Sequence, residues 1–238
     1  MAAEPNSTIA IVIPAYNEAS VVGSVISDLS RAFSHDKLAA EIIVVDDGSK
    51  DETAERSRLA GARVIRHILN TGSGGATATG LSYAQQNGFA FAATLDADGQ
   101  HHPEDVIKGI KLMIKSGDDL LIGSRLIDTN GMSKLKVVGN KGLSFITYVL
   151  FGVSVTDSQS GLRIFSKKAL DRLKWKTSGY EFCSEMLWRA KQQRLSIKEY
   201  PIRAIYTEYS QAKGQDNWNA VNIIKSLLKR RLMELFGE

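Results

Sequence analysis

Short apolar segments alternate with amphipathic segments along the first half of this chain, and that alternation restricts the possible folds more than any other feature. Apolar runs typical of strands cover residues 8–16, 41–47, 63–67, 89–96 and 119–125. Apolar residues at helical spacing occupy the intervening residues 18–33, 51–61, 76–88 and 103–117. Consecutive parallel strands need a crossover connection, which is usually a helix. We therefore predict an α/β fold whose mainly parallel sheet has helices on both faces.

The pattern becomes less regular after these segments. The remaining elements are predicted as an amphipathic segment at about 136–152, a strand at 160–166, a helix at 180–193, a strand at 197–206 and an amphipathic helix at 217–236. Pro201 interrupts the last strand, and because proline cannot donate a ladder hydrogen bond, we expect an edge strand there. The chain is accordingly divided into a main α/β domain, residues 1–215, and a C-terminal amphipathic helix, residues 216–238.

Polar residues gather where the predicted strands end. They are Glu18, Asp46, Asp47, Asp96, Asp98 and Arg125. In open parallel sheets the carboxyl ends of the strands meet at one edge, and ligands bind there. Carboxylates brought together repel each other unless a cation or hydrogen-bond donors compensate for their charge. The sequence therefore predicts a ligand site at this edge.

The stretch LDADGQHHPE places Asp96, Asp98 and Gln100 at alternate positions after an apolar run. Alternate residues of an extended segment share one side. Carboxylate and amide oxygens are hard ligands that suit Mg²⁺ or Mn²⁺, ions that keep coordination positions for substrate phosphates. We predict a divalent metal site at these residues. The two carboxylates would also suit the acid/base pair of a glycosidase, and the spacing alone leaves that alternative open.

The single cysteine, Cys183, excludes an intrachain disulfide and a zinc site built from several cysteines. No segment reaches the roughly 20 apolar residues that span a bilayer, and the N-terminal residues lack the basic and apolar regions of a signal peptide. We expect a cytoplasmic protein that associates peripherally with the cytosolic face of a membrane.

Basic residues cluster beside apolar residues in two places. One cluster is Lys134, Lys136 and Lys141, and the other is Lys225, Lys229, Arg230 and Arg231. Such clusters suit nucleic acid, anionic lipid or a phosphorylated ligand, and the neighbouring aromatic and aliphatic residues favour lipid. We predict binding to a membrane surface and no nucleic-acid partner. Two solvated helix faces are the alternative, and the apolar stripe of the last helix would equally suit the protein's own core or a second subunit.

Five motifs occur in an order that resembles the family-2 glycosyltransferases. They are PAYNE, DDGS, DADGQHHPE, GSR and D-x-x-S-G-x-R, the last starting at Asp157. Over about residues 8–215 the chain is similar to the polyprenyl-phosphate branch of that family, typified by dolichol-phosphate mannose synthase. The resemblance implies a GT-A fold and inverting transfer of a sugar from GDP-mannose or a UDP-hexose to a polyprenyl or dolichyl phosphate.

The resemblance also implies roles for individual residues. Nucleotide-sugar contacts would come from Pro14, Ala15, Tyr16, Glu18, Asp46, Asp47, Asp96, Ser210 and Lys213. The metal ion and diphosphate would be held by Asp96, Asp98 and Gln100. The acceptor phosphate would be held by Arg125 and, in an interfacial segment at about 134–152, by Lys136, Asn140 and Lys141. Catalysis would rest on Asp96 and Asp98 through the metal, and on Arg125 through its planar fork for phosphate.

The acceptor decides whether a general base is required. A lipid phosphate is already anionic near neutral pH, whereas a hydroxyl acceptor needs a group that takes its proton. The alternative function is therefore transfer to a soluble or polysaccharide hydroxyl, with Asp157 as the candidate base. A third interpretation is a catalytically silent sugar-nucleotide-binding or assembly partner. A separate membrane protein or a second copy of the chain would be further partners.

Other conspicuous residues have simpler interpretations. The segment NTGSGGA lacks the G-K-[ST] ending of a P-loop, so we expect a tight turn with close backbone packing. Ser73 stands in this segment where relatives commonly have lysine. We expect His101 and His102 in a solvated loop, and Glu181 and Glu185, one helical turn apart, on an exposed helix face.

Overall fold

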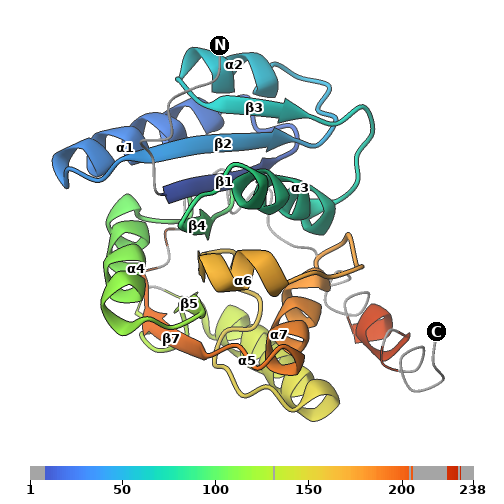
Figure 1. Ribbon diagram of the computed structural model, residues 1–238. Helices are drawn as coiled ribbons and strands as arrows, with labels where there is room; N and C mark the ends of the chain where they lie inside the picture. The colour runs from blue at the N-terminus through green and yellow to red at the C-terminus, as the bar shows by residue number, and fades with distance from the viewer. Residues whose placement is uncertain (1–8, 131, 204, 206–223, 230, 232–238) are drawn as a thin grey trace.

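The computed structural model describes residues 9–130, 132–203, 205, 224–229 and 231. Within these residues a seven-stranded sheet has the order β3-β2-β1-β4-β6-β5-β7 (Figure 1). Its strands are β1 (Ile9–Ala15), β2 (Ala40–Asp46), β3 (Arg63–Arg66), β4 (Phe91–Thr94), β5 (Leu120–Ser124), β6 (Arg163–Ser166) and β7 (Ile197–Pro201). Every pairing is parallel except those of β6, which is antiparallel to β4 and β5. The predicted α/β fold with a mainly parallel sheet is confirmed.

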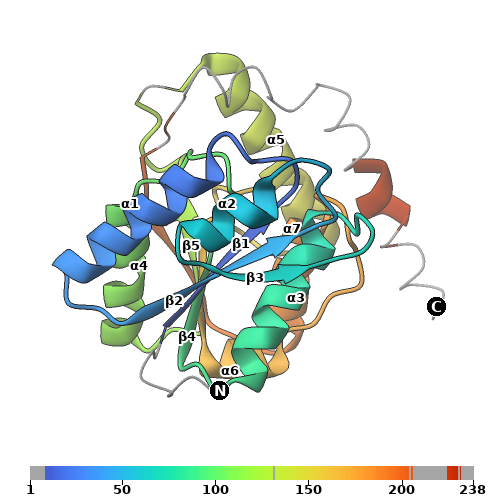
Figure 2. The ribbon, with the colours of Figure 1, turned by 90° about the horizontal axis from the view of Figure 1, so that it is seen from above.

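Helices cover both faces of the sheet. They are α1 (Val22–His35), α2 (Thr53–Leu59), α3 (Ser73–Gln86), α4 (Pro103–Ser116), α5 (Lys134–Phe151), α6 (Lys167–Arg172) and α7 (Phe182–Gln192). The core layer on one face is formed with α1 and α4, and the layer on the other face with α3, α5, α6 and α7 (Figure 2). In β1, Ile11 and Ile13 face the first layer while Ala10 and Val12 face the second. This two-sided burial explains why the central parallel strands are continuous apolar runs.

Strand β7 and helix α6 show which elements the apolar pattern of the sequence could and could not predict. Strand β7 lies at the edge of the sheet and ends at Pro201, so the predicted edge strand is confirmed. Helix α6 was not predicted from the sequence. It has 6 residues and follows β6 directly, so it is too short to show a helical period of apolar residues.

The reversed direction of β6 determines what lies next to the site. Arg163, its first residue, is in register with Thr94 on β4 and with Ile122 on β5. Because β6 runs against both neighbours, the turn that precedes it lies between the segments that follow β4 and β5. Those two segments carry Asp96 and Arg125.

Part of the predicted C-terminal helix lies among the described residues, where 224–229 are helical. Leu227 is buried in the core layer formed with α3, α5 and α7, and Ile224 packs against that layer. Leu228 is 45% exposed. This part of the helix therefore packs on the protein's own core. No helix in the described part of the chain is long and apolar enough to cross a membrane.

Candidate active site

The loops that follow β1 and β2 begin side by side at the carboxyl edge of the sheet. Ala15 and Asp46, the last residues of these strands, are paired in register. The loops are joined because the backbone N–H of Asn17 donates to Oγ of Ser49 at 2.9 Å. Asn17 has a φ of 55°, in the left-handed region that asparagine tolerates better than most residues.

The first loop carries most of the predicted nucleotide contacts. Tyr16 is 39% exposed, whereas Ala15 and Glu18 are buried and Pro14 is partly buried. The backbone N–H of Glu18 donates to Oγ1 of Thr53 at 2.8 Å, which fixes the end of the loop. The structure thus presents the Tyr16 ring at the surface of the sheet edge and keeps Glu18 inside the loop.

Asp46 ends β2 with a fully buried side chain. Its Oδ1 accepts the backbone N–H of Ser49 at 3.0 Å, and its Oδ2 lies 3.1 Å from Nε of Arg66. Arg66 was not among the predicted site residues. It ends β3 at the same edge, so the rule that selected the other strand ends could have selected it too. Its side chain is 55% exposed and adds a positive charge beside Asp46 at this edge of the sheet.

Asp47, the next predicted nucleotide contact, is bonded within the protein. Its carboxylate accepts hydrogen bonds from the N–H groups of Thr71 and Gly72 and from the Thr71 hydroxyl, and Oδ1 lies 2.7 Å from Nδ1 of His67. Burial acts to raise the pKa of Asp47, but these hydrogen bonds outweigh it and lower the pKa. Asp47 therefore shapes the loop that leads into α3.

The glycine-rich segment 70–76, which leads into α3 and forms its first turn, packs closely against residues 177–179. A Cβ on Gly72, whose φ is 87°, would lie 2.4 Å from the carbonyl oxygen of Ser178. The N–H of Gly74 donates to that same oxygen at 2.7 Å. The predicted close backbone packing is confirmed, but residues 73–76 form the first turn of α3 and not a tight turn. Ser73 occupies the first turn of α3, and its Oγ has no hydrogen-bond partner among the described residues.

Glu185 of α7, which was predicted to be exposed, is bonded to the segment on which the glycine-rich segment packs. Its side chain is fully buried, and its carboxylate accepts the backbone N–H groups of Lys176 and Thr177. The prediction of an exposed position is therefore wrong for Glu185. The turn at 174–181 folds back over α7, and its unpaired backbone groups require a buried acceptor.

Asp98 and Gln100 lie together in the loop after β4. Asp98 accepts the backbone N–H of Gln100 at 3.0 Å through Oδ1 and its side-chain amide at 2.8 Å through Oδ2. Burial and the negative charge of Asp96 raise the pKa of Asp98 to about 6. The raised pKa means that the protein by itself compensates poorly for the negative charge of this loop.

Asp96 contacts a histidine that was predicted to be solvated. The side chain of His101 is 3% exposed, and its Nε2 lies 3.4 Å from Oδ2 of Asp96. The prediction of a solvated position is therefore wrong for His101, since Pro103 starts α4 and the preceding turn directs this ring inward. Partial removal from water acts to raise the pKa of Asp96, but the contact with His101 and the positive charges of Arg125 and Arg163 lower it.

The loop after β4 fits a hard divalent cation. Within the described residues, no group of three or more His, Cys, Asp or Glu side chains is arranged so that it could hold a metal ion. Asp96, Asp98 and Gln100 would supply a partial set of oxygen ligands, and a cation would offset the burial and the Asp96 charge that raise the pKa of Asp98. Mg²⁺ and Mn²⁺ suit a partial set, because water and substrate phosphates complete their coordination.

Arg125 and Asp157 face each other across the ends of β5 and the turn before β6. Nε of Arg125 lies 2.7 Å from Oδ2 of Asp157, and Nη2 lies 3.0 Å from Oδ1. The Asp157 side chain is fully buried and that of Arg125 is 18% exposed. Both oxygens of Asp157 are thus engaged in a bidentate ion pair, which orients the guanidinium at the edge of the site.

The predicted acceptor residues of α5 occupy two different faces. Lys136 and Asn140 lie on the helix face that continues into the buried residues Leu143 and Thr147. Lys141 lies about 100° around the helix from Asn140 and is exposed. The exposed side of α5 also carries apolar residues, namely Leu135 (73% exposed), Val138 (68%), Phe145 (65%) and Val149 (63%).

Two predicted donor contacts, Ser210 and Lys213, lie outside the described residues. The described residue nearest to them in sequence is Ile205. Its N–H donates to the carbonyl of Gln100 at 3.2 Å. The path of the chain after β7 therefore returns to the loop that carries Asp96 and Asp98.

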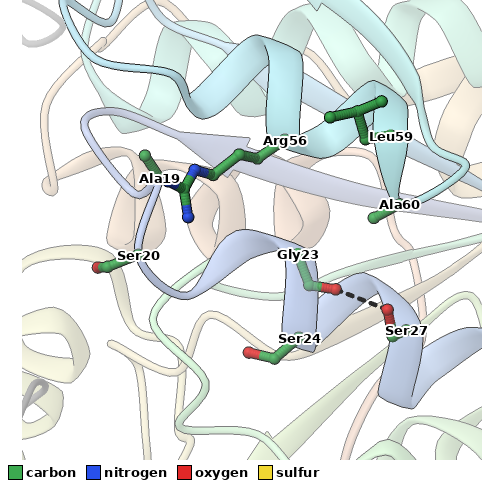
Figure 3. Close-up of a pocket in the computed structure, with 8 residues that line it drawn as sticks. All are labelled: Ala19, Ser20, Gly23, Ser24, Ser27, Arg56, Leu59 and Ala60. Atoms are coloured by element: carbon green, nitrogen blue, oxygen red, sulfur yellow. Dashed lines mark hydrogen bonds between the residues drawn. The ribbon is translucent and has the colours of Figure 1, made fainter.

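A groove between α1 and α2, of about 380 Å³, lies beside the first loop (Figure 3). It is lined by Ala19, Ser20, Gly23, Ser24, Ser27, Arg56, Leu59 and Ala60. The Ser27 hydroxyl donates to the carbonyl of Gly23, and Arg56 forms an ion pair with Glu52. None of the predicted site residues lines this groove.

Comparison with known proteins identifies relatives over nearly the whole chain. The family model described as glycosyl transferase family 2 matches residues 10–174. An uncharacterized protein of Methanocaldococcus jannaschii is 43% identical over 231 residues, which cover 95% of this chain and 92% of that protein. The UDP-N-acetylglucosamine–dolichyl-phosphate N-acetylglucosaminyltransferase of Methanococcus voltae is 42% identical over 244 residues, which cover 93% of this chain and 95% of that protein.

Solved structures are similar in fold. Glucosyl-3-phosphoglycerate synthase from Mycobacterium tuberculosis, in complex with Mn²⁺, uridine diphosphate and phosphoglyceric acid, aligns with a TM-score of 0.73. The two chains are 20% identical, and the alignment covers 98% of this chain and 79% of that one. The fold is thus the GT-A type that the sequence motifs led us to expect.

Proposed function

This chain belongs to glycosyl transferase family 2, and we propose that it transfers a sugar from a nucleotide diphosphate sugar to a polyprenyl phosphate at a membrane surface. The relative from Methanococcus voltae, by its name, uses UDP-N-acetylglucosamine and dolichyl phosphate, and it matches this chain over almost the full length of both. UDP-N-acetylglucosamine is therefore the first donor to test, with other UDP-hexoses and GDP-mannose next.

The observation that carries the acceptor assignment is the bidentate pair of Arg125 and Asp157. A hydroxyl acceptor needs a carboxylate or histidine that can take its proton. Asp157, the candidate for that task, is fully buried and has both oxygens on Arg125. A phosphate acceptor is already anionic and needs an oriented cation, which this pair provides. The geometry therefore favours a phosphate over the alternative hydroxyl acceptor.

On the donor side, Asp96, Asp98 and Gln100 would hold a divalent metal, Mn²⁺ or Mg²⁺. The bound metal would neutralise charge on the departing nucleoside diphosphate. Tyr16 would contact the nucleotide from its exposed position after β1, and Arg66 would add a positive charge beside Asp46. Ser210 and Lys213 remain proposed diphosphate contacts from the segment that follows Ile205.

On the acceptor side, α5 would meet the membrane. Its exposed apolar side chains at 135, 138, 145 and 149 suit the boundary between headgroups and acyl chains. Lys134 and Lys141, exposed on the same outer part of the helix, suit anionic headgroups. Lys136, which is exposed, and Asn140, which is partly buried, would contact the lipid phosphate together with Arg125.

The test uses the full chain, Mn²⁺, radiolabelled UDP-N-acetylglucosamine and a polyprenyl phosphate in mixed micelles. Label extracted into organic solvent, with the mass of a polyprenyl phosphoryl sugar, is the expected result. The Asp98→Ala variant and a reaction with chelator serve as controls. Label that appears only on a polysaccharide or another hydroxyl compound would contradict the phosphate acceptor.

A further inference from the structure

We propose that Arg163 is a positioning residue of this transferase, which holds the turn at residues 157–162 and thereby sets both Asp96 and Arg125. The inference rests on the proposed function, since it assigns Asp96 to the donor side and Arg125 to the acceptor side. The turn touches both residues because β6 is inserted antiparallel between β4 and β5.

The donor-side contact is made by Gly161. A Cβ at this position would lie 2.3 Å from Oδ2 and 2.7 Å from Cγ of Asp96, so the carboxylate rests directly on the glycine. The Gly161 carbonyl accepts the Thr94 hydroxyl at 2.8 Å, which holds this part of the turn to the end of β4. Any larger residue at 161 would push Asp96 away from its present position.

The acceptor-side contact is made by Asp157 at the start of the same turn. Besides its two bonds to the guanidinium, Asp157 accepts the backbone N–H of Arg125 at 3.2 Å. Its own N–H donates to Oε1 of Glu199 on β7 at 3.1 Å. A shift of the turn would therefore move the guanidinium of Arg125 along with it.

Arg163 connects the parts of this turn from inside the protein. Its side chain is 1% exposed, with Nη2 donating to the carbonyl of Ser158 at 2.8 Å and Nε donating to that of Ser160 at 3.0 Å. Nη1 donates to the carbonyl of Cys183 in α7 at 3.1 Å. A planar fork can reach several fixed carbonyls at once, and a lysine ammonium cannot reproduce that geometry.

The turn also has a direct connection to α5. The N–H of Ser158 donates to Oγ of Ser144 at 2.9 Å, and the Ser144 hydroxyl donates to Oγ of Ser158 at 3.3 Å. Arg163 thus braces a single segment that contacts the proposed metal loop, the acceptor arginine and the proposed acceptor helix. Burial of the Arg163 guanidinium costs desolvation free energy. That cost is consistent with a need to hold the donor side and the acceptor side in a fixed relative position.

The decisive comparison is between Arg163→Lys and Gly161→Ala, with Arg63→Lys as a control at the start of β3. Mn²⁺ affinity is measured in the presence of UDP by electron paramagnetic resonance of the free ion, and acceptor KM and melting temperature are measured in parallel. Loss of a supporting residue around metal ligands typically weakens metal binding by about 10- to 100-fold. We expect Gly161→Ala to weaken Mn²⁺ binding in this range while its acceptor KM stays within about twofold.

For Arg163→Lys we expect weaker Mn²⁺ binding and a higher acceptor KM together, each by at least about fivefold. A purely structural role would lower the melting temperature but leave both quantities unchanged in the folded protein, and that result would overturn the inference. If Arg163→Lys does not fold, Arg163→Gln decides, since its neutral amide keeps a hydrogen-bond donor without a charge to bury: wild-type Mn²⁺ affinity and acceptor KM in the folded variant would overturn the inference, and weakening of both would support it. A wild-type protein that binds Mn²⁺ and UDP but does not glycosylate polyprenyl phosphate would contradict only the proposed function.

Discussion

Arg125 and Asp157 form a bidentate ion pair at the carboxyl edge of the sheet, although 32 positions separate them in the chain. Asp157 is buried beneath the guanidinium and accepts hydrogen bonds on both oxygens. The pair converts a flexible arginine at a strand end into an oriented cation. It also engages both oxygens of Asp157, the carboxylate predicted as the candidate base for a hydroxyl acceptor.

Replacing Arg125 with lysine keeps the positive charge but removes the planar guanidinium that can form two parallel hydrogen bonds. We expect the acceptor KM to rise by about tenfold or more, which corresponds to the loss of one hydrogen bond between charged groups, while the donor KM changes little. Initial rates at varied concentrations of each substrate measure the two constants. A larger effect on the donor KM than on the acceptor KM would argue that Arg125 serves the nucleotide sugar.

The Asp98→Ala substitution tests the metal site. Alanine removes an oxygen ligand, so we expect transfer in Mn²⁺ or Mg²⁺ to be lost and Mn²⁺ affinity to fall, with the fold retained. Isothermal titration with Mn²⁺ and circular dichroism measure these properties. Asp28→Ala, on the exposed surface of α1, is the matched control. Full activity of the Asp98 variant, or of the wild type in a chelator, would refute a catalytic metal at this loop.

The hydrogen bonds of Asp47 predict a pH-dependent contribution to stability. The folded protein lowers the pKa of this group from 3.8, so its contribution is present above that value and is lost as the pH falls through the folded pKa. Asp47→Asn leaves an amide that cannot accept the N–H of Gly72, and we expect it to cost about 1–3 kcal/mol at pH 7. Urea unfolding from pH 7 to pH 3 should show the difference shrinking below about pH 4. A difference that is constant over this range would contradict the assignment.

The exposed apolar side of α5 predicts where the protein meets a membrane. Phe145→Glu combined with Val149→Glu should reduce co-sedimentation with anionic liposomes by at least about tenfold, since two apolar side chains lose their burial in lipid. The variant should keep its melting temperature because both side chains are exposed. Ile114→Glu, at a 54% exposed position on α4, is the matched control and should bind liposomes like the wild type. Equal binding by all three proteins would place the membrane contact elsewhere.

Much of the fold was readable from local patterns. The apolar runs of the parallel strands, the proline that starts α4 and the proline at the edge strand are properties of short segments. The positions of Asp96 and Asp98 after a buried strand could be identified for the same reason, because a strand end is local. The expected alternation does not reach Asp98, since β4 ends at Thr94 and residues 97–98 form a turn. Even Arg66 follows from the strand-end rule, although it was not among the predicted residues.

Other features depend on segments that meet only in the folded protein. The burial of His101 and Glu185 follows from turns that fold back over helices, and neighbouring residues in the sequence give no indication of it. The contact of Gly161 with Asp96 and the pairing of Arg125 with Asp157 require β6 to run antiparallel between β4 and β5. An apolar strand pattern reads the same in either direction. The sequence by itself therefore determined which segments become strands and which carboxylates end them. The direction of β6, and with it the partners of Asp96 and Arg125, was decided only in the tertiary structure, where β6 pairs with β4 and β5, strands that are distant from it in the chain.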